Sequence, residues 1–252
     1  MYDVIGDVHG CRKELHTLLR KLGYKQSNGG LYHPENRMPV FLGDLTDRGP
    51  DSLGVIKDVS IWVKKQQALY CPGNHCDKLY RFFIGRDVRI NNGLETTIAE
   101  WEALPPGEQQ TAAGTFRNLY ENAPLYLMLD AANLVVAHAG IRHKDIGRKD
   151  RRVKSFVLYG DVTGAKDKEG FPVRRDWPEI YPQGENCIVY GHTPVITPRI
   201  VGKTVNIDTG CVFGGKLTAF RYPEKTFVCA ASEMPRAPEK FKDFAGGKKG
   251  SE

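Results

Sequence analysis

The chain has 252 residues, of which 40% are hydrophobic and 26% are charged. This length allows one large domain or two small ones with a buried core, and the composition is ordinary for a globular protein. No apolar run approaches the roughly 18 residues that a membrane-spanning helix needs. The first residues enter a strand-like run at once, without a basic segment or a cleavage site, so we expect a cytoplasmic protein with no membrane partner.

The net charge is +6, from 36 basic and 30 acidic residues. This mild excess would help to attract a phosphate-bearing substrate, but it does not indicate a specific nucleic-acid binder. Part of it lies in the basic run 148–152 and part near the C-terminus. We interpret both as solvent-exposed surface.

Six cysteines occur, and no two of them are spaced as Cys-x-x-Cys. This spacing argues against a zinc knuckle and against a thioredoxin-like site. In a cytosolic chain of this size we expect reduced thiols, several of them in core strands.

The first third of the chain alternates strand-like and helix-like segments. Apolar runs predict strands, and apolar residues three and four positions apart predict helices, in the order 1–6 (strand), 11–22 (helix), 39–42 (strand), 51–66 (helix) and 68–71 (strand). Residues 24–38 are typical of a hairpin or loop. The order is a βαβ pattern, in which ligands bind beyond the carboxyl ends of the strands.

The later segments are less regular. The pattern predicts helix over 95–122 with a break at 104–107, a pair of strands over 125–138, and short strands from 187 to about 230. The polar segment 142–186 has no strong periodicity, and we interpret it as a long functional loop region. We therefore expect a single domain over 1–231, followed by a loosely ordered tail over 232–252 that is rich in Pro, Lys and Gly.

Polar residues that can bind metals follow several of these strands, each within two positions of a glycine. They are Asp7, His9, Asp44, Asn74, His138 and His192. Side chains two apart in an extended chain point to the same side, so Asp7 and His9 can present an oxygen and a nitrogen to one point. Carboxylate and imidazole together suit a borderline divalent metal, and glycine permits a close approach of the backbone to it.

The order of these motifs resembles that of a known family. Gly-Asp-x-His-Gly, Gly-Asp-x-x-Asp-Arg-Gly, Gly-Asn-His, His-Ala-Gly and Gly-His-Thr begin at residues 6, 43, 73, 138 and 191. Together they resemble the calcineurin-like metallophosphoesterases, in the phosphoprotein-phosphatase branch. Segments 156–164 and 206–214 are similar to the bacterial bis(5′-nucleosyl)-tetraphosphatases of the PrpE type.

The resemblance implies an α/β fold of two packed mixed β-sheets flanked by helices, with a dinuclear metal site at the strand ends. It also implies two divalent transition metals. Asp7, His9 and Asp44 would hold the first, while Asp44, Asn74, His138 and His192 would hold the second. Mn or Ni is expected, and Fe and Zn also fit these nitrogen and oxygen ligands. Such a pair can activate a bridging water and neutralise the charge on a phosphoryl group.

The resemblance further assigns His75 as the general acid, held by Asp47, and assigns Arg48 and Asn74 to the substrate phosphate. A second phosphate-binding arginine is expected at Arg174 or Arg175, and the spacing does not choose between them. Cys76 stands where the family usually has a glutamate that is not a ligand, and we expect a packing role for it.

Three functions remain open. The first is a metal-dependent phosphohydrolase that splits diadenosine tetraphosphate asymmetrically into ATP and AMP. The second is a protein phosphatase that acts on phosphoserine, phosphothreonine or phosphotyrosine. The third is a nucleotide-binding regulator without catalysis, although a pure binder would need no pair of His75 and Asp47.

Two other chemistries fail on spacing. Cys76 and Arg81 are too close for a Cys-x5-Arg phosphatase motif. Gly202-Lys203-Thr204 lacks the glycine that a phosphate-binding loop requires at residue 197, and it is typical of a turn between strands.

Overall fold

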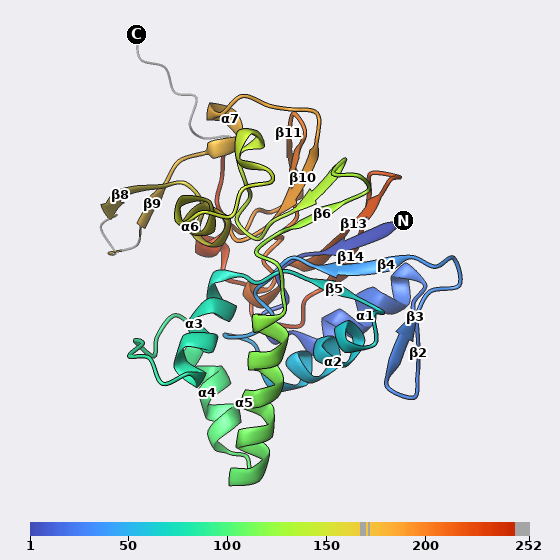
Figure 1. Ribbon diagram of the computed structural model, residues 1–252, viewed down its shortest axis with the longest axis vertical. Coiled ribbons are helices and arrows are strands. Elements are labelled where there is room, and N and C mark those ends of the chain that lie inside the picture. The colour runs from blue at the N-terminus through green and yellow to red at the C-terminus, as the bar shows by residue number, and fades with distance from the viewer. Residues whose placement is uncertain (167–169, 171, 245–252) are drawn as a thin grey trace.

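The computed structural model describes residues 1–166, 170 and 172–244. Its centre is a pair of five-stranded mixed sheets, with helices outside them (Figure 1). The predicted α/β class of two packed sheets flanked by helices is confirmed.

The first sheet has the strand order β14-β13-β1-β4-β5. Its strands are β1 (Tyr2–Ile5), β4 (Met38–Phe41), β5 (Leu69–Tyr70), β13 (Lys216–Tyr222) and β14 (Thr226–Ala231). Strands β1, β4 and β5 run parallel, and β13 returns antiparallel to β1. The parallel strands follow from the βαβ crossovers through α1 (Arg12–Leu22) and α2 (Ser52–Lys64).

The second sheet has the order β11-β12-β10-β7-β6. Its strands are β6 (Leu127–Leu129), β7 (Leu134–Val136), β10 (Cys187–Tyr190), β11 (Arg199–Val201) and β12 (Thr204–Asn206). In this sheet the three central strands β7, β10 and β12 are parallel, and the edge strands are antiparallel to them. Each sheet therefore gathers three strand carboxyl ends at one edge.

Apolar clusters between the sheets and beneath the helices hold the layers together. Between the sheets, residues such as Val4, Val40, Val136 and Val189 are fully buried. Outside the first sheet, α1 and α2 bury an apolar stripe that includes Leu15, Leu18, Val55 and Val59. Burial of these side chains is the main term that favours the folded state.

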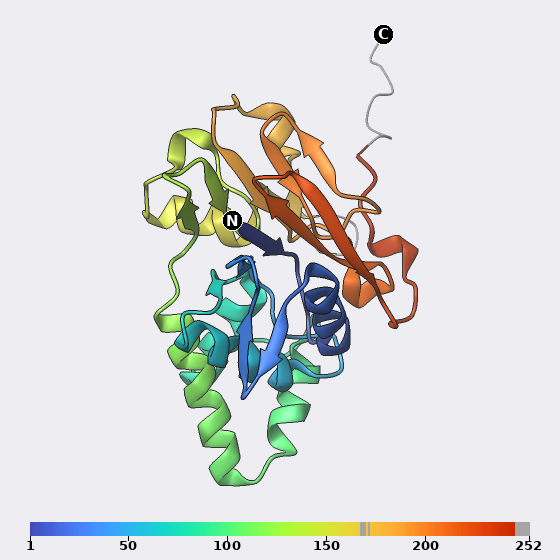
Figure 2. The ribbon, with the colours of Figure 1, turned by 90° about the vertical axis from the view of Figure 1, so that its right-hand side faces the viewer.

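A helical arm and two hairpins project from this sandwich. The arm consists of α3 (Asn74–Phe83), α4 (Leu94–Glu102) and α5 (Pro106–Glu121), and it lies at the opposite end of the molecule from the second sheet in both views (Figures 1 and 2). The hairpins are β2 (Lys25–Ser27) with β3 (Gly30–Tyr32) and β8 (Val162–Lys166) with β9 (Pro172–Arg174). No helix in the described ranges is both long enough and apolar enough to span a membrane.

The prediction of a long loop over 142–186 was wrong. This segment contains a 3₁₀ turn η1 (His143–Asp145), α6 (Arg151–Tyr159), the hairpin of β8 and β9, and α7 (Trp177–Ile180). Residues 167–169 and 171 of it lie outside the described residues. Helix α6 is only about two turns long, and it is stabilised by burying Val153, Phe156 and Val157 against the second sheet rather than by a long periodic pattern.

The prediction of a loosely ordered tail from residue 232 was wrong for residues 232–244. The amides of Ser232, Ala237 and Lys242 donate hydrogen bonds to Gly215, Phe213 and Pro194. A 3₁₀ turn η3 (Pro238–Lys240) follows. The rest of the predicted tail, residues 245–252, lies outside the described residues.

Candidate metal centre

Polar side chains follow all six parallel strands of the two sheets. Asp7 and His9 follow β1, Asp44 follows β4, and Asn74 opens α3 after β5; His138, His192 and Asp208 follow β7, β10 and β12. Because the carboxyl ends of neighbouring parallel strands meet at one edge, these residues converge from both sheets. The structure thus brings together the six predicted metal ligands and adds Asp208.

One group of ligand atoms surrounds the ring of His138. Its Nε2 atom lies 3.0 Å from Asn74 Oδ1, 3.1 Å from His192 Nδ1 and 3.3 Å from Asp44 Oδ2. A ring nitrogen carries at most one proton, so it cannot satisfy all three neighbours. A cation among these four atoms would satisfy them together, and they are the predicted ligands of the second metal.

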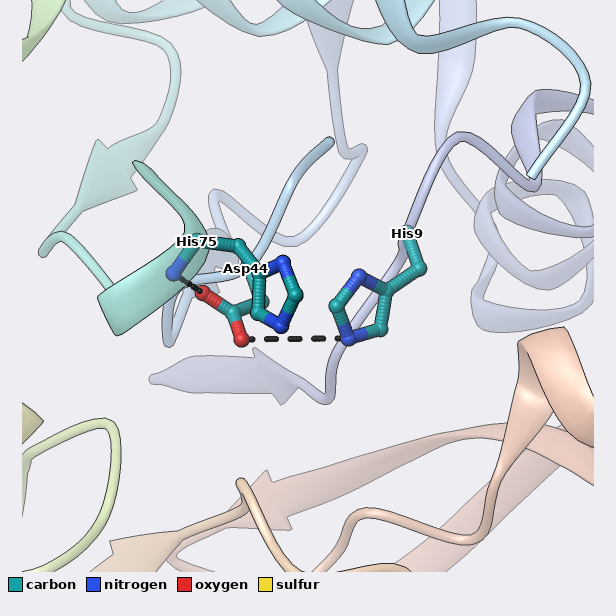
Figure 3. A group of neighbouring side chains, drawn as sticks. All are labelled: His9, Asp44 and His75. Carbon is teal, nitrogen blue, oxygen red and sulfur yellow. Dashed lines mark hydrogen bonds and ion pairs between the residues drawn. The ribbon is translucent and has the colours of Figure 1, made fainter. Parts of the chain in front are cut away.

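A second group contains His9, Asp44 and His75 (Figure 3). His9 Nε2 lies 3.7 Å from Asp44 Oδ2, while the other Asp44 oxygen accepts a hydrogen bond of 2.9 Å from the amide of His75. The Nδ1 atom of His9 donates to the carbonyl of Thr46 at 2.7 Å, so its lone pair is on Nε2, the atom that a metal would bind. Asp44 belongs to both groups, as a bridging carboxylate would.

Asp7 lies beside these groups rather than inside either of them. Its Oδ2 accepts from the amide of His192 at 3.1 Å and lies 3.9 Å from His138 Nδ1. Its Oδ1 is buried and has no hydrogen-bond partner among the described residues. An unpartnered buried carboxylate oxygen is costly, so this atom fits a metal ligand.

Two glycines allow the carboxylates to lie against the backbone. A Cβ atom at Gly73 would sit 2.1 Å from Asp44 Oδ1, and one at Gly191 would sit 2.2 Å from Asp7 Oδ1. Any larger residue would displace a predicted ligand. This explains in physical terms why glycines accompany the motifs.

The electrostatics of the site also suit cations. Burial, followed by the charge of Arg48, lowers the pKa of His9, and burial followed by His138 and Arg174 lowers that of His192, so both rings are neutral. Although burial opposes it, Asp44 and Asp7 raise the pKa of His138 to about 9. Burial would raise the pKa of Asp44, but His138 and His75 bring it well below its ordinary value. His138 therefore holds a proton that a metal would have to displace.

His75 is held in one orientation by a buried network. Its Nδ1 donates to Asp47 Oδ2 at 2.7 Å, and the other Asp47 oxygen accepts from the hydroxyl of Thr97 at 2.8 Å. Asp47 and Thr97 are fully buried. The carboxylate favours a proton on Nδ1 and points Nε2 into the site.

The Arg48 side chain contacts both His9 and His75. Its guanidinium donates to His9 Nε2 at 2.6 Å and to His75 Nε2 at 2.8 Å, and it stacks over the ring of Phe213 at 5.3 Å. In this arrangement the guanidinium covers the same nitrogens that a metal and a leaving oxygen would need. Its planar donors are suited to phosphate oxygens.

The two arginines that spacing left open differ in their surroundings. Both line a cleft of about 750 Å³ that also includes Arg48 and His192. Arg175 pairs with Asp161 at 3.3 Å. Among the described residues, Arg174 donates to carbonyl oxygens alone, with Nε 2.8 Å from the oxygen of Tyr159, and its side chain lies near Gly160. The basic run 148–152 does not line this cleft, and Arg148 in it pairs with Asp145 and Asp150.

Two residues of the site were missed in the sequence. Asp208 is buried, and burial raises its pKa to about 6. It follows β12, so the strand-end signal that identified the other residues could have found it. Thr97 reaches Asp47 from α4, fifty positions away, and no local pattern could have indicated that contact.

Cys76 lies away from the solvent, in the core between the first sheet and its helices. Burial raises the pKa of its thiol to about 12, which keeps it protonated at neutral pH.

The chain belongs to the calcineurin-like phosphoesterase family, whose sequence pattern matches residues 2–227. A protein of Geobacillus thermodenitrificans named bis(5′-nucleosyl)-tetraphosphatase PrpE [asymmetrical] is 59% identical over 96% of this chain and 99% of its own length. A protein of Oceanobacillus iheyensis with the same name is 57% identical and covers 96% of both chains.

Solved structures share the fold. A crystal structure described as a candidate diadenosine tetraphosphatase has a TM-score of 0.63 and 23% identity, over 92% of this chain and 93% of its own. A serine/threonine phosphatase of Saccharomyces cerevisiae has a TM-score of 0.56 and 16% identity, over 94% of this chain and 81% of its own. At such identities the likeness concerns the fold alone.

Proposed function

We propose that this protein hydrolyses dinucleoside polyphosphates, and diadenosine tetraphosphate in particular, asymmetrically into ATP and AMP. The observation that carries this proposal is the near-complete coverage by relatives of 55–59% identity that bear the name of that activity. The site supports it, because the candidate ligand His192 and three arginines line one cleft, and the groups that could hold a metal include His192.

In this proposal the residues at the strand ends hold two divalent cations. Asp7, His9 and Asp44 would hold one, and Asp44, Asn74, His138 and His192 would hold the other. When bound, the cations would supply an activated water and neutralise phosphate charge. Mn and Ni are the expected metals, although Fe and Zn suit the same ligand atoms.

The chain's own side chains supply the rest of the chemistry. His75 gives a proton to the leaving oxygen from Nε2, and Asp47 keeps the ring oriented and stabilises its charged form. Arg48 releases the two histidines and binds phosphate oxygens, together with Asn74. Arg174 is the second phosphate-binding arginine, because no carboxylate among the described residues neutralises its charge, whereas Arg175 is paired with Asp161.

The test compares two substrates on one preparation. Protein treated with EDTA and then supplied with Mn or Ni is incubated with diadenosine tetraphosphate, and the products are separated by chromatography. We expect ATP and AMP in equal amounts. ADP as the sole product would indicate symmetrical cleavage. Turnover of a phosphopeptide without turnover of the dinucleotide would favour a protein phosphatase. Asp44→Asn, prepared in parallel, should be inactive and so controls for contaminating enzymes.

A further inference from the structure

The segment after β14 forms one wall of the catalytic cleft. Glu239, Lys240, Lys242 and Phe244 line the same cleft as Arg48, Arg174 and His192. They belong to the part of the chain whose sequence gave no sign of a role. Their placement raises the question of what a basic wall in this position could bind.

Contacts to Pro194, Gly210 and Arg199 fix this wall to the rest of the chain, and a further contact lies within the wall itself. Lys242 donates its amide to Pro194, two residues after His192, at 2.8 Å. Phe241 packs on Gly210, two residues after Asp208, so closely that a Cβ there would lie 2.5 Å from its ring. Arg236 stacks over Phe241 at 4.0 Å, and Arg199 stacks over Phe244 at 4.1 Å.

The charges along the cleft are not balanced. Three of its acidic residues already have partners in the protein. Asp161 binds Arg175 and Tyr181, and Asp176 binds Arg199. Glu95 accepts a hydrogen bond from the amide of Gly93. Among the described residues, the side chains of Lys240 and Lys242 make no ion pair or hydrogen bond. The same holds for Glu239, the one acidic neighbour beside them that lines the cleft.

Arg48 and Arg174 are likewise bound to no carboxylate in the described part of the chain. Four cationic side chains therefore line one cleft without an acidic partner among the described residues. Arg48 and Arg174 come from the main body of the fold, and Lys240 and Lys242 belong to the wall. A single phosphate could engage only those beside the metal-binding residues. A chain of several phosphates could extend from there toward the lysines.

We propose that Lys240 and Lys242 form a subsite for the phosphates that lie beyond the bond that is cleaved. This inference rests on the proposed function and specifies how the same site selects its substrate. Asymmetrical cleavage leaves three phosphates on one product, and charges placed away from the metals would hold them. Lysine suits this role because its mobile ammonium can follow a flexible chain of phosphates.

The experiment uses the full chain with Lys240→Ala and Lys242→Ala combined. We expect kcat/KM for diadenosine tetraphosphate to fall about tenfold, as the loss of one or two charge-assisted contacts implies, mainly through KM. Hydrolysis of p-nitrophenyl phosphate, which has one phosphate, should be unchanged. The preference for tetraphosphate over triphosphate dinucleotides should shrink, and Lys→Arg at both positions should restore it.

Two further variants sharpen the result. Glu239→Gln removes the acidic group beside the lysines and should lower KM for the dinucleotide about twofold, a change opposite to that of the lysine variant. Lys25→Ala with Lys57→Ala removes the same amount of charge at two exposed lysines that do not line the cleft. This variant should hydrolyse both substrates as the unaltered protein does.

The outcomes separate this inference from the proposed function. If the unaltered protein does not split the dinucleotide, the proposed function fails. If it does, the subsite is refuted by either of two results for the Lys240 and Lys242 variant. One is an unchanged KM for the dinucleotide, and the other is an equal loss of activity toward the dinucleotide and p-nitrophenyl phosphate. An equal effect of the Lys25 and Lys57 variant would also refute it, because net charge alone would then explain the change.

Discussion

At the scale of single residues, two histidines of the site have one ring nitrogen, Nδ1, bound to another group of the protein. His9 Nδ1 donates a hydrogen bond to the carbonyl of Thr46, and His75 Nδ1 donates one to the carboxylate of Asp47. Each ring therefore turns its other nitrogen, Nε2, toward the guanidinium of Arg48. The same ring chemistry would suit a metal at His9 and proton transfer at His75, because of these two rings only that of His75 donates to a buried carboxylate.

His75→Asn tests the proton-transfer role. We expect kcat for diadenosine tetraphosphate to fall about a hundredfold, which is the lower end of what general acid catalysis contributes. The loss should be smaller for p-nitrophenyl phosphate, whose leaving group needs no proton. Metal content, measured by elemental analysis, should stay the same. Thr97→Val, which removes the hydroxyl that donates to the Asp47 carboxylate and accepts from the Asp47 amide, should lower the rate less. A full rate in His75→Asn would show that another group is the acid.

At the scale of secondary-structure elements, the fold separates segments that carry the site from segments that support it. The loops after the parallel strands carry the candidate ligands, and a Cβ atom at Gly73 or Gly191 in these loops would collide with Asp44 or Asp7. The helices of the arm tolerate change more readily. Gly114 in the middle of α5 shows this, since a Cβ there would meet no atom within 4 Å.

Gly114→Ala should stabilise the protein by about 0.5–1 kcal/mol, because glycine loses more backbone freedom on folding than alanine does. Urea unfolding followed by circular dichroism measures this. The matched control is Gly54→Ala in α2, where a Cβ would lie 2.3 Å from Asp51 Oδ1. Asp51 caps that helix by accepting from the amide of Gly54, so alanine should destabilise it by about 1 kcal/mol. A gain in both variants would mean that helix propensity alone decides.

At the scale of the whole molecule, the two sheets are joined by their apolar faces, while ligand side chains from both meet at one edge. Cations bound there would tie the two halves together. Their contribution to stability should depend on pH, because the side chains bind protons when no metal is present.

The metal-free protein should lose stability as pH rises. His138 has an ordinary pKa of 6.5 and a folded value of about 9, so proton binding favours the folded state below pH 6.5 and this gain disappears through pH 9. A metal needs the deprotonated ring, so its affinity should rise over the same range. Thermal unfolding with EDTA and with Mn at pH 6.5 and 8.5 measures both effects. The increase in Tm caused by Mn should be larger at pH 8.5, and an equal or smaller increase would contradict this account.

The sequence by itself determined the strands that carry the site and most of its residues. The signal was local: an apolar run, a glycine and a polar residue follow one another within a few positions, and parallel strands bring such ends together. Asp7, His9, Asp44, Asn74, His138 and His192 could all be found in this way. Asp208 carries the same signal after β12.

Only the tertiary structure decided what depends on contacts between distant segments. It placed Thr97 on Asp47, gave Arg175 a carboxylate partner in Asp161, and packed α6 on the second sheet. It also fixed residues 232–244 beside the cleft through Phe241 and Lys242. These features have no periodic signal in the chain, because their stability comes from packing and hydrogen bonds to segments that are far away in the sequence.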